Sequence, residues 1–154
     1  MTIRKFLQSD AEELSALMKE TVIKSNSKDY SKTAVRNLID EYTPERLIKD
    51  SEKMDIFVAS EKFKLLGTIS LIDNRISIMF VLPKVQGKKI GSKLIKHVET
   101  FAKKEEKATL KVRSSLTAYG FYQKLGYQKT RRASNKFVGP IIWMKKYFRL
   151  PRSI

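Results

Sequence analysis

The amino-acid sequence predicts a single α+β domain, in which helices and strands are mixed. Its 154 residues are enough for one domain with a real core. Two apolar runs, 55–60 and 64–72, flank a short turn and predict an antiparallel hairpin. Residues 75–105 then run from an apolar strand through a glycine-bearing turn into a helix. The domain is expected to span 1–148, with a loose C-terminal tail over 149–154.

The N-terminal third is predicted to hold a short strand followed by helices. Residues 2–7 form the strand, and a Ser-Asp pair caps a helix over 11–24. After a polar loop, a second helix is expected over 29–41. A third helix is expected over 43–49, with a proline in its own first turn. The side chains expected to face inward are Leu14, Leu17, Met18, Tyr30, Ala34 and Leu38.

The stretch after the hairpin has the features of an anion-binding site. An apolar strand over 75–83 is stopped by proline, and a basic turn over 84–92 leads into a helix. The first N–H groups of a helix lack internal partners and carry partial positive charge. Glycines let the backbone approach an anion, Lys88 and Lys89 add charge, and Ser92 serves as the N-cap or as another donor. The same pattern also fits an ordinary strand-to-helix turn with a solvated basic face.

The helix that follows this turn is amphipathic and is expected to end near Lys104. Its apolar residues fall at helical spacing on one face: Leu94, Ile95, Val98, Phe101 and Ala102. The opposite face, expected to be solvated, carries Lys93, Lys96, His97, Glu99, Lys103 and Lys104. The rest of the chain predicts a strand over 109–113, a helix over 116–125 capped by Ser114-Ser115 and ended by Gly126, and strands over 127–131 and 138–148, the last limited by Pro140.

Composition excludes several kinds of chemistry. The chain has no cysteine, which rules out disulfides, thiolate metal ligands and an acyl-cysteine intermediate. Its single histidine, His97, rules out a histidine-rich metal site. No apolar run reaches the length of a membrane span and Met1–Lys5 starts no signal peptide, so a cytoplasmic protein without a membrane partner is expected. The net charge of +16 attracts anions and would suit nucleic acid or acidic surfaces.

Two motifs in the second half of the chain resemble those of a known family. Val81-x-Pro83 followed by Gln86-Gly87-Lys88-Lys89-Ile90-Gly91 is similar to the acetyl-CoA-binding motif of the GNAT superfamily N-acetyltransferases, whose core is Gln/Arg-x-x-Gly-x-Gly/Ala. Residues 118–127 resemble the family's Ala-x-x-Phe-Tyr-x-Lys-x-Gly-Phe/Tyr helix and turn. With Thr2-Ile3-Arg4 opening the chain in the family's manner, the resemblance covers nearly all 154 residues. It implies the GNAT fold: a mostly antiparallel sheet of six to seven strands with helices on both faces, splayed at the central strand pair.

The resemblance also implies a site for acetyl-CoA as cosubstrate, with no metal. The pyrophosphate would bind to the loop formed by Gln86, Gly87, Lys88, Lys89, Ile90, Gly91 and Ser92. The main chain of Phe80 and Val81 would pair with the pantetheine arm, as an added strand would. Ser115 stands where many relatives carry an asparagine that contacts the cofactor. Lys89 replaces the first glycine of the motif and would be strained if its φ were positive.

Catalytic roles follow from the same resemblance. Tyr122 matches the family's tyrosine beside the sulfur, which protonates the leaving thiolate; alternatively it is a core aromatic that anchors its helix. The N–H of Val81 is the expected oxyanion donor. Ser77 occupies the place of an acidic residue in many relatives and could hold a water that relays the proton. Direct attack of the amine on the thioester, with orientation supplying much of the rate, is therefore the expected mechanism. Remote candidates for a base are Asp40, Glu41 and Asp73.

The predicted function is N-acetylation of a primary amine on a small molecule or peptide, in a ternary complex with acetyl-CoA. Two alternatives stay open: a CoA-binding protein of this fold without catalysis, suggested by Ser77 and Lys89, and a basic nucleic-acid-binding module. Aromatics near basic residues motivate the latter: Tyr127, Phe137, Trp143, Tyr147 and Phe148. The acceptor could be a polyamine, an aminoglycoside, an amino acid or a protein amine. Acidic residues expected near its pocket would suit a cationic amine: Asp29, Asp40, Glu41 and Glu45. A homodimer is compatible with the sequence.

Overall fold

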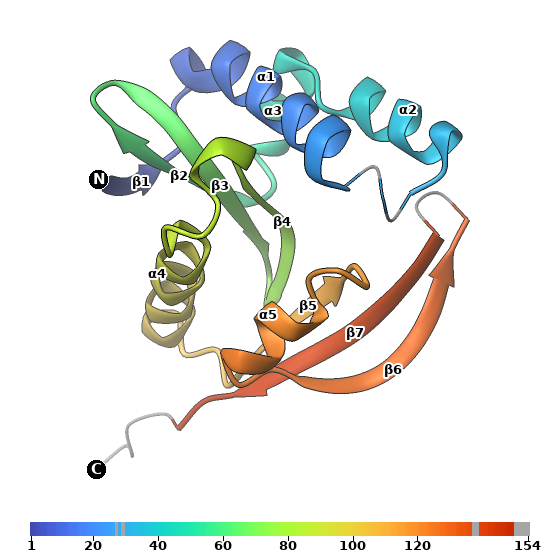
Figure 1. The fold of residues 1–154 in the computed structure, drawn as a ribbon. Helices are drawn as coiled ribbons and strands as arrows, with labels where there is room; N and C mark the ends of the chain where they lie inside the picture. Colours follow the sequence, from blue (N-terminus) through green and yellow to red (C-terminus); the bar gives the residue numbers. More distant parts are fainter. Residues whose placement is uncertain (27, 29, 137–138, 150–154) are drawn as a thin grey trace.

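A sheet of seven strands forms the centre of the molecule, in the order β1-β2-β3-β4-β5-β7-β6 (Figure 1). The computed structural model describes residues 1–26, 28, 30–136 and 139–149. Neighbouring strands run antiparallel except β4 and β5, which run parallel. This confirms the mostly antiparallel sheet that the resemblance implied. The strands are β1 (Thr2–Lys5), β2 (Asp55–Glu61), β3 (Lys64–Ile72), β4 (Arg75–Val81), β5 (Thr109–Ser114), β6 (Gln128–Asn135) and β7 (Gly139–Tyr147).

The sheet opens between β4 and β5. These strands pair at only two positions, Arg75 with Lys111 and Ile76 with Val112. Beyond Ile76, the rest of β4 continues without a register partner on β5, while its other edge stays paired with β3 up to Val81. The splay expected at the central strand pair is therefore present, and it leaves one edge of β4 facing a gap.

Helices cover both faces of the sheet (Figure 1). One face carries α1 (Ala11–Thr21), α2 (Lys32–Glu41) and α3 (Pro44–Asp50), and the other carries α4 (Ile90–Lys104) and α5 (Tyr119–Lys124). Short 3₁₀ turns precede α1 (Gln8–Asp10) and follow β4 (Pro83–Val85), and a wide π-type turn (Val22–Asn26) follows α1. Leu14, Leu17, Met18 and Leu47 pack against the first face; Leu94, Ile95, Val98 and Tyr122 pack against the second.

Helix boundaries differ from the sequence expectations where side chains supply local hydrogen bonds. The α-helical part of the first helix ends at Thr21, whose Oγ1 bonds back to the Leu17 carbonyl at 2.8 Å, a contact that bends helices. The second helix starts at Lys32, not 29, because Ser31 is its N-cap and accepts from the Ala34 N–H at 3.1 Å.

The helix expected over 116–125 is also shorter. Residues 116–118 form a turn, in which Ser115 Oγ accepts from the Ala118 N–H at 3.2 Å, and α5 begins at Tyr119. At the other end Gly126, with φ +95°, lies at the C′ position as predicted. Its N–H donates to Gln123 and that of Tyr127 donates to Tyr122, the two bonds of a Schellman cap.

The polar face predicted for α4 is partly buried. Glu99 is 8% exposed, forms an ion pair with Lys146 of β7 at 2.9 Å and accepts a hydrogen bond from the Tyr127 hydroxyl at 3.2 Å. His97 packs edge-on against Phe57 with ring centroids 4.7 Å apart, and burial lowers its pKa. Both residues therefore correct the expectation of a solvated face.

Some sequence expectations lie outside the described residues. They concern Asp29, Phe137, the first residue of the strand predicted over 138–148, and the tail beyond Arg149.

Candidate active site

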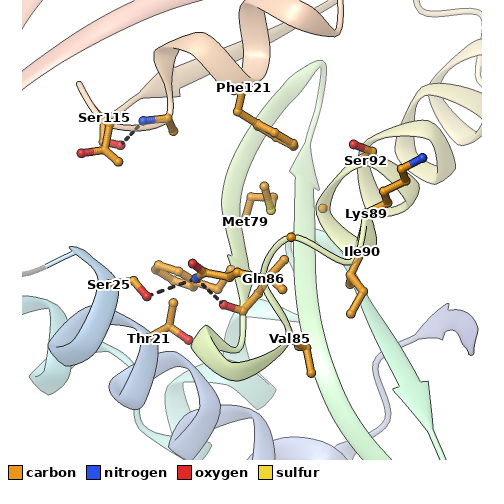
Figure 2. A pocket seen from close by; sticks show the side chains of 16 residues that line it. Thr21, Ser25, Met79, Val85, Gln86, Lys89, Ile90, Ser92, Ser115 and Phe121 are labelled. Carbon is orange, nitrogen blue, oxygen red and sulfur yellow. Dashed lines mark hydrogen bonds between the residues drawn. The ribbon is translucent and has the colours of Figure 1, made fainter.

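Two adjacent cavities lie along β4, and most of the predicted site residues line them. The outer cavity has a volume of about 450 Å³ and the inner one about 150 Å³. Met79, Phe80, Ser115 and Ala118 line both, so the two meet there. The outer cavity (Figure 2) is lined by Thr21, Ser25, Met79, Phe80, Val81, Val85, Gln86, Gly87, Lys89, Ile90, Gly91, Ser92, Ser115, Thr117, Ala118 and Phe121. The inner cavity is lined by Tyr30, Ile76, Ser77, Ile78, Met79, Phe80, Val112, Arg113, Ser115, Ala118 and Tyr122.

The main chain of β4 presents polar groups to these cavities. The Leu82 N–H donates to the Leu66 carbonyl of β3 at 2.9 Å. Because N–H groups alternate in direction along a strand, those of Val81 and Met79 point away from β3, toward the gap beside β5. Met79 lines both cavities, whereas Val81 lines only the outer one.

The N-terminus of α4 opens into the outer cavity. The first α-helical bond joins the Lys93 N–H to the Lys89 carbonyl at 3.1 Å, so the N–H groups of residues 90–92 precede it. Lys89 is the N-cap residue and has φ +65°, in the left-handed region. This is the positive φ at which a lysine in place of the motif's first glycine is strained. Ser92 is thus the third residue of the helix and not its N-cap, although it does line the cavity. Lys88 is exposed and absent from the lining of both cavities.

Gly91 allows α4 and α5 to approach each other. A Cβ atom added to Gly91 would lie 3.2 Å from Phe121 Cζ and 3.4 Å from Met79 Cε. A larger residue would therefore push against the aromatic side chain that forms one wall of the outer cavity (Figure 2). The glycine of the motif has a packing reason here in addition to its closeness to the cavity.

The side chain of Gln86 holds the loop to two other segments. Its Nε2 donates to the Val81 carbonyl at 3.0 Å and to Ser25 Oγ at 3.1 Å (Figure 2). Ser25 belongs to the π-type turn after α1, and such turns are common at functional sites. Gln86 therefore connects the end of β4, the loop and the end of α1.

The inner cavity brings together two of the residues predicted to act on the reacting groups, Ser77 and Tyr122, whereas Val81 lines only the outer cavity. Ser77 is the extra residue of a β-bulge, because Ser70 pairs with Ile78 and Leu71 pairs with Ile76. Tyr122 of α5 is 4% exposed, and burial raises the pKa of its phenol. Its ring also contacts Phe121 and Tyr127 edge-on, so it belongs to the core as well as to the cavity.

The acidic residues weighed as bases or as partners of a cationic amine lie elsewhere. Asp73 pairs with Lys107 at 2.9 Å, and Asp40, Glu41 and Glu45 are exposed. Over the part of the chain that the structure describes, neither cavity is lined by a carboxylate.

Several lining residues were missed by the sequence analysis. Tyr30 and Arg113 line the inner cavity. From the sequence, Tyr30 is expected on the buried face of a helix, and Arg113 is only part of an alternating strand. Alternation did indicate that Arg113 faces away from Val112, but it could not indicate that this face borders a cavity. Thr21, Ser25 and Phe121 carry no local signal, because tertiary contacts bring them to the outer cavity.

The chain belongs to the GNAT acetyltransferases: the family model described as an acetyltransferase (GNAT) domain matches residues 26–148. This family consists of acetyl-CoA-dependent N-acetyltransferases, as the two motifs suggested.

Solved structures share the fold. A GCN5-related N-acetyltransferase from Rhodopseudomonas palustris is 22% identical, with a TM-score of 0.87 over 96% of this chain and 95% of that one. PaiA N-acetyltransferase from Thermoplasma acidophilum, solved in complex with coenzyme A, is 20% identical, with a TM-score of 0.81 over 96% and 98%. An aminoglycoside 6'-N-acetyltransferase from Enterococcus faecium is 19% identical, with a TM-score of 0.75 over the full length of both chains.

Two further findings concern the described ranges only. None of their helices combines the length and the apolar character needed to cross a bilayer. They also contain no cluster of three or more histidine, aspartate or glutamate side chains arranged to hold a metal ion.

Proposed function

We propose that this protein transfers the acetyl group of acetyl-CoA to a primary amine by direct attack in a ternary complex. The observation that carries the proposal is the junction of the two cavities beside Met79 and Ser115. A long ligand in the outer cavity and a second ligand in the inner cavity would meet at this point, beside the polar main-chain edge of β4.

The outer cavity suits the anionic cosubstrate. Lys89 and the first residues of α4, Ile90, Gly91 and Ser92, line it, and the N–H groups that precede the first helical bond, a lysine charge and a serine hydroxyl all favour an anion. The pyrophosphate would bind there, and the pantetheine arm would extend along the β4 edge at Met79 and Val81, whose N–H groups point to the gap. The main chain of Phe80 faces β3, which corrects the pairing expected for it, although Phe80 does line both cavities. The complex of PaiA from Thermoplasma acidophilum with coenzyme A supports a CoA site in this fold.

The chemistry then requires one bond to form and one to break. The amine lone pair attacks the acetyl carbon, the C–S bond breaks, and the products are an N-acetyl amide and CoA. The N–H of Val81, or that of Met79 on the same edge and nearer the junction, would stabilise the oxyanion. Tyr122 would give its proton to the leaving thiolate, and a water held by Ser77 would accept the proton lost by the amine.

The absence of a lining carboxylate among the described residues supports attack by an amine that is already neutral. Orientation in the two cavities would then supply much of the rate, without a strong base. We also expect the protein to act in the cytoplasm.

The nucleic-acid alternative finds less support. Base stacking needs open aromatic faces, but Tyr127 is 1% exposed and guanidinium groups of Arg113 and Arg131 lie over the Trp143 ring at 5.9 and 5.4 Å. Tyr147 is 69% exposed, but the ammonium group of Lys145 lies over its ring at 5.5 Å.

Two measurements test the proposal. Acetyl-CoA should raise the Tm; at one hundred times its Kd the stabilisation is about 2.7 kcal/mol. Release of the CoA thiol, followed over a panel of small amines and peptide N-termini, should identify at least one acceptor. No Tm shift at millimolar acetyl-CoA contradicts the proposal, and a Tm shift without thiol release favours a CoA-binding protein that lacks catalysis.

A further inference from the structure

One wall of the inner cavity is basic. Arg113 lines it from β5, on the sheet face opposite Val112, which packs in the core beneath α4. Its register partner on β7 is Trp143, and its guanidinium lies over the indole ring at 5.9 Å. Stacking on an aromatic ring holds a guanidinium in place while its N–H groups remain available to a planar anion.

A second arginine lies near the first: the register partner of Arg75 on β5 is Lys111, two residues before Arg113 and therefore on the same sheet face. Arg75 precedes the lining residue Ile76 on β4 and is only partly exposed. Its pKa is lowered by burial and by the positive charge of Arg113. An anion between or beside the two guanidinium groups would offset the repulsion that Arg75 experiences.

Neither guanidinium is neutralised by the described part of the protein. The ion pairs found there involve neither Arg75 nor Arg113, and no carboxylate lines either cavity. Tyr30 adds a phenol group to the lining of the same cavity. The net charge of +16 strengthens the attraction for anions.

We propose that the acetyl acceptor is an amine that also carries a carboxylate or phosphate group, which Arg113, assisted by Arg75, binds at the basic wall of the inner cavity. This inference rests on the proposed function and names its substrate class. The anionic group would anchor the acceptor and direct its amine toward the cavity junction. Polycationic acceptors are disfavoured, contrary to what the acidic residues of the N-terminal helices suggested from sequence.

The kinetic test uses acceptor pairs that differ in charge. β-Alanine is compared with β-alaninamide, and O-phosphoethanolamine with ethanolamine; cadaverine is the cationic reference. We expect kcat/KM to be at least about 10-fold higher for the anionic member of at least one pair, and the pair with the larger ratio identifies the group. Arg113→Gln should lower kcat/KM for the anionic member by about 10- to 100-fold, the effect of losing a charge-assisted hydrogen bond, and leave the neutral member within about 2-fold.

Controls separate this effect from loss of folding or of net charge. Arg132→Gln removes an exposed arginine of β6 that shares the sheet face of its register partner Ile142, opposite to the face that carries Arg113 and Trp143, and it should preserve the preference for anionic acceptors. Arg113→Lys keeps the positive charge and should therefore retain part of the preference for anionic acceptors. Both Arg113 variants should keep the Tm shift with acetyl-CoA. The proposal is overturned if neutral or cationic amines react equally well or better, or if Arg113→Gln affects both members of a pair alike.

A binding test does not depend on turnover. Trp143 is the only tryptophan in the chain and contacts Arg113, so its fluorescence reports on this wall. N-acetylglycine or N-acetyl-O-phosphoethanolamine should change it saturably, N-acetylglycinamide should not, and Arg113→Gln should abolish the change. A charge-selective fluorescence response without acetylation of any amine would contradict the proposed function but support the anion site. No charge-selective response overturns the anion site.

Discussion

The side-chain amide of Gln86 donates a hydrogen bond to the main-chain carbonyl of Val81, five residues earlier, at 3.0 Å. The family motif led us to assign Gln86 to the pyrophosphate site, yet its amide also bonds to Ser25 at 3.1 Å. It therefore holds the loop in place by connecting it to the end of β4 and to the turn after α1.

Replacing Gln86 by leucine should weaken acetyl-CoA binding more than it weakens the fold. We expect Kd to rise about 5- to 30-fold, because one or two hydrogen bonds that order the loop are lost. The free energy of unfolding should fall by less than about 1 kcal/mol, because the side chain is exposed. Calorimetric titration and urea unfolding measure the two effects, with Gln128→Leu on β6 as the matched control. Unchanged affinity would mean that the loop keeps its conformation without these bonds.

Tyr122→Phe should lower kcat and spare cofactor binding. The phenyl ring keeps the edge contacts with Phe121 and Tyr127, at 5.2 and 5.8 Å, so the variant should fold. Loss of a general acid costs on the order of 10²-fold or more in rate. Tyr119→Phe, one turn earlier in α5 and outside both cavities, is the control. Equal turnover in Tyr122→Phe would leave Tyr122 as a core aromatic only.

The pH dependence of the rate should follow the acceptor and not Tyr122. Burial raises the pKa of the Tyr122 phenol, so it stays protonated up to at least the ordinary tyrosine value of about 10. The kcat/KM should rise as the pH increases through the pKa of the acceptor amine. It should show no decline at any pH lower than 10. Profiles with two amines of different pKa test this, because the inflection should move with the amine. A common decline between pH 8 and 10 would contradict the assignment.

The left-handed conformation of Lys89 predicts a difference between two neighbouring lysines. Lys89→Gly relieves a φ of +65°, whereas Lys88→Gly only adds freedom to the unfolded chain. Each variant loses one positive charge, so we expect Lys89→Gly to be the more stable by about 1–2 kcal/mol. Acetyl-CoA should nevertheless bind less tightly to Lys89→Gly, since only Lys89 lines the outer cavity. Urea unfolding and calorimetric titration provide both comparisons, and equal stability of the two would show that position 89 is unstrained.

Asp10 should make the fold sensitive to acid. The Arg4 guanidinium, 2.8 Å away, and the Leu7 N–H lower the pKa of the Asp10 carboxyl, which is 8% exposed. Because the folded pKa lies below the unfolded one, this stabilisation is complete above about pH 4 and is lost as pH falls through the folded value. Asp10→Asn should destabilise at pH 7 by about 1–3 kcal/mol and flatten the decline below pH 4. Asp73→Asn, at an exposed pair, should change little, and an equal effect of both would refute the argument.

Short-range patterns accounted for most of the elements. The β4–loop–α4 unit and the Gly126 cap follow from a continuous apolar run, 3.6-residue spacing and glycine conformations, all local properties. The burial of Glu99 did not follow, because its partner Lys146 is 47 residues away and joins it only through the sheet. Arg113 was missed for a similar reason: alternation gives a strand two faces, and only the splay decides which of them borders a cavity.

The two-position pairing of β4 with β5 has a mechanical consequence. The sheet is continuous on either side of the β4–β5 pair and nearly interrupted at it. The amide hydrogens of Met79 and Val81 should therefore exchange with deuterium faster than those of Phe80 and Leu82, which face β3. A ligand whose amides lie in the gap would act as an inserted strand and slow that exchange. The cosubstrate would then stiffen the half of the molecule into which the acceptor must fit, favouring an order in which it binds first.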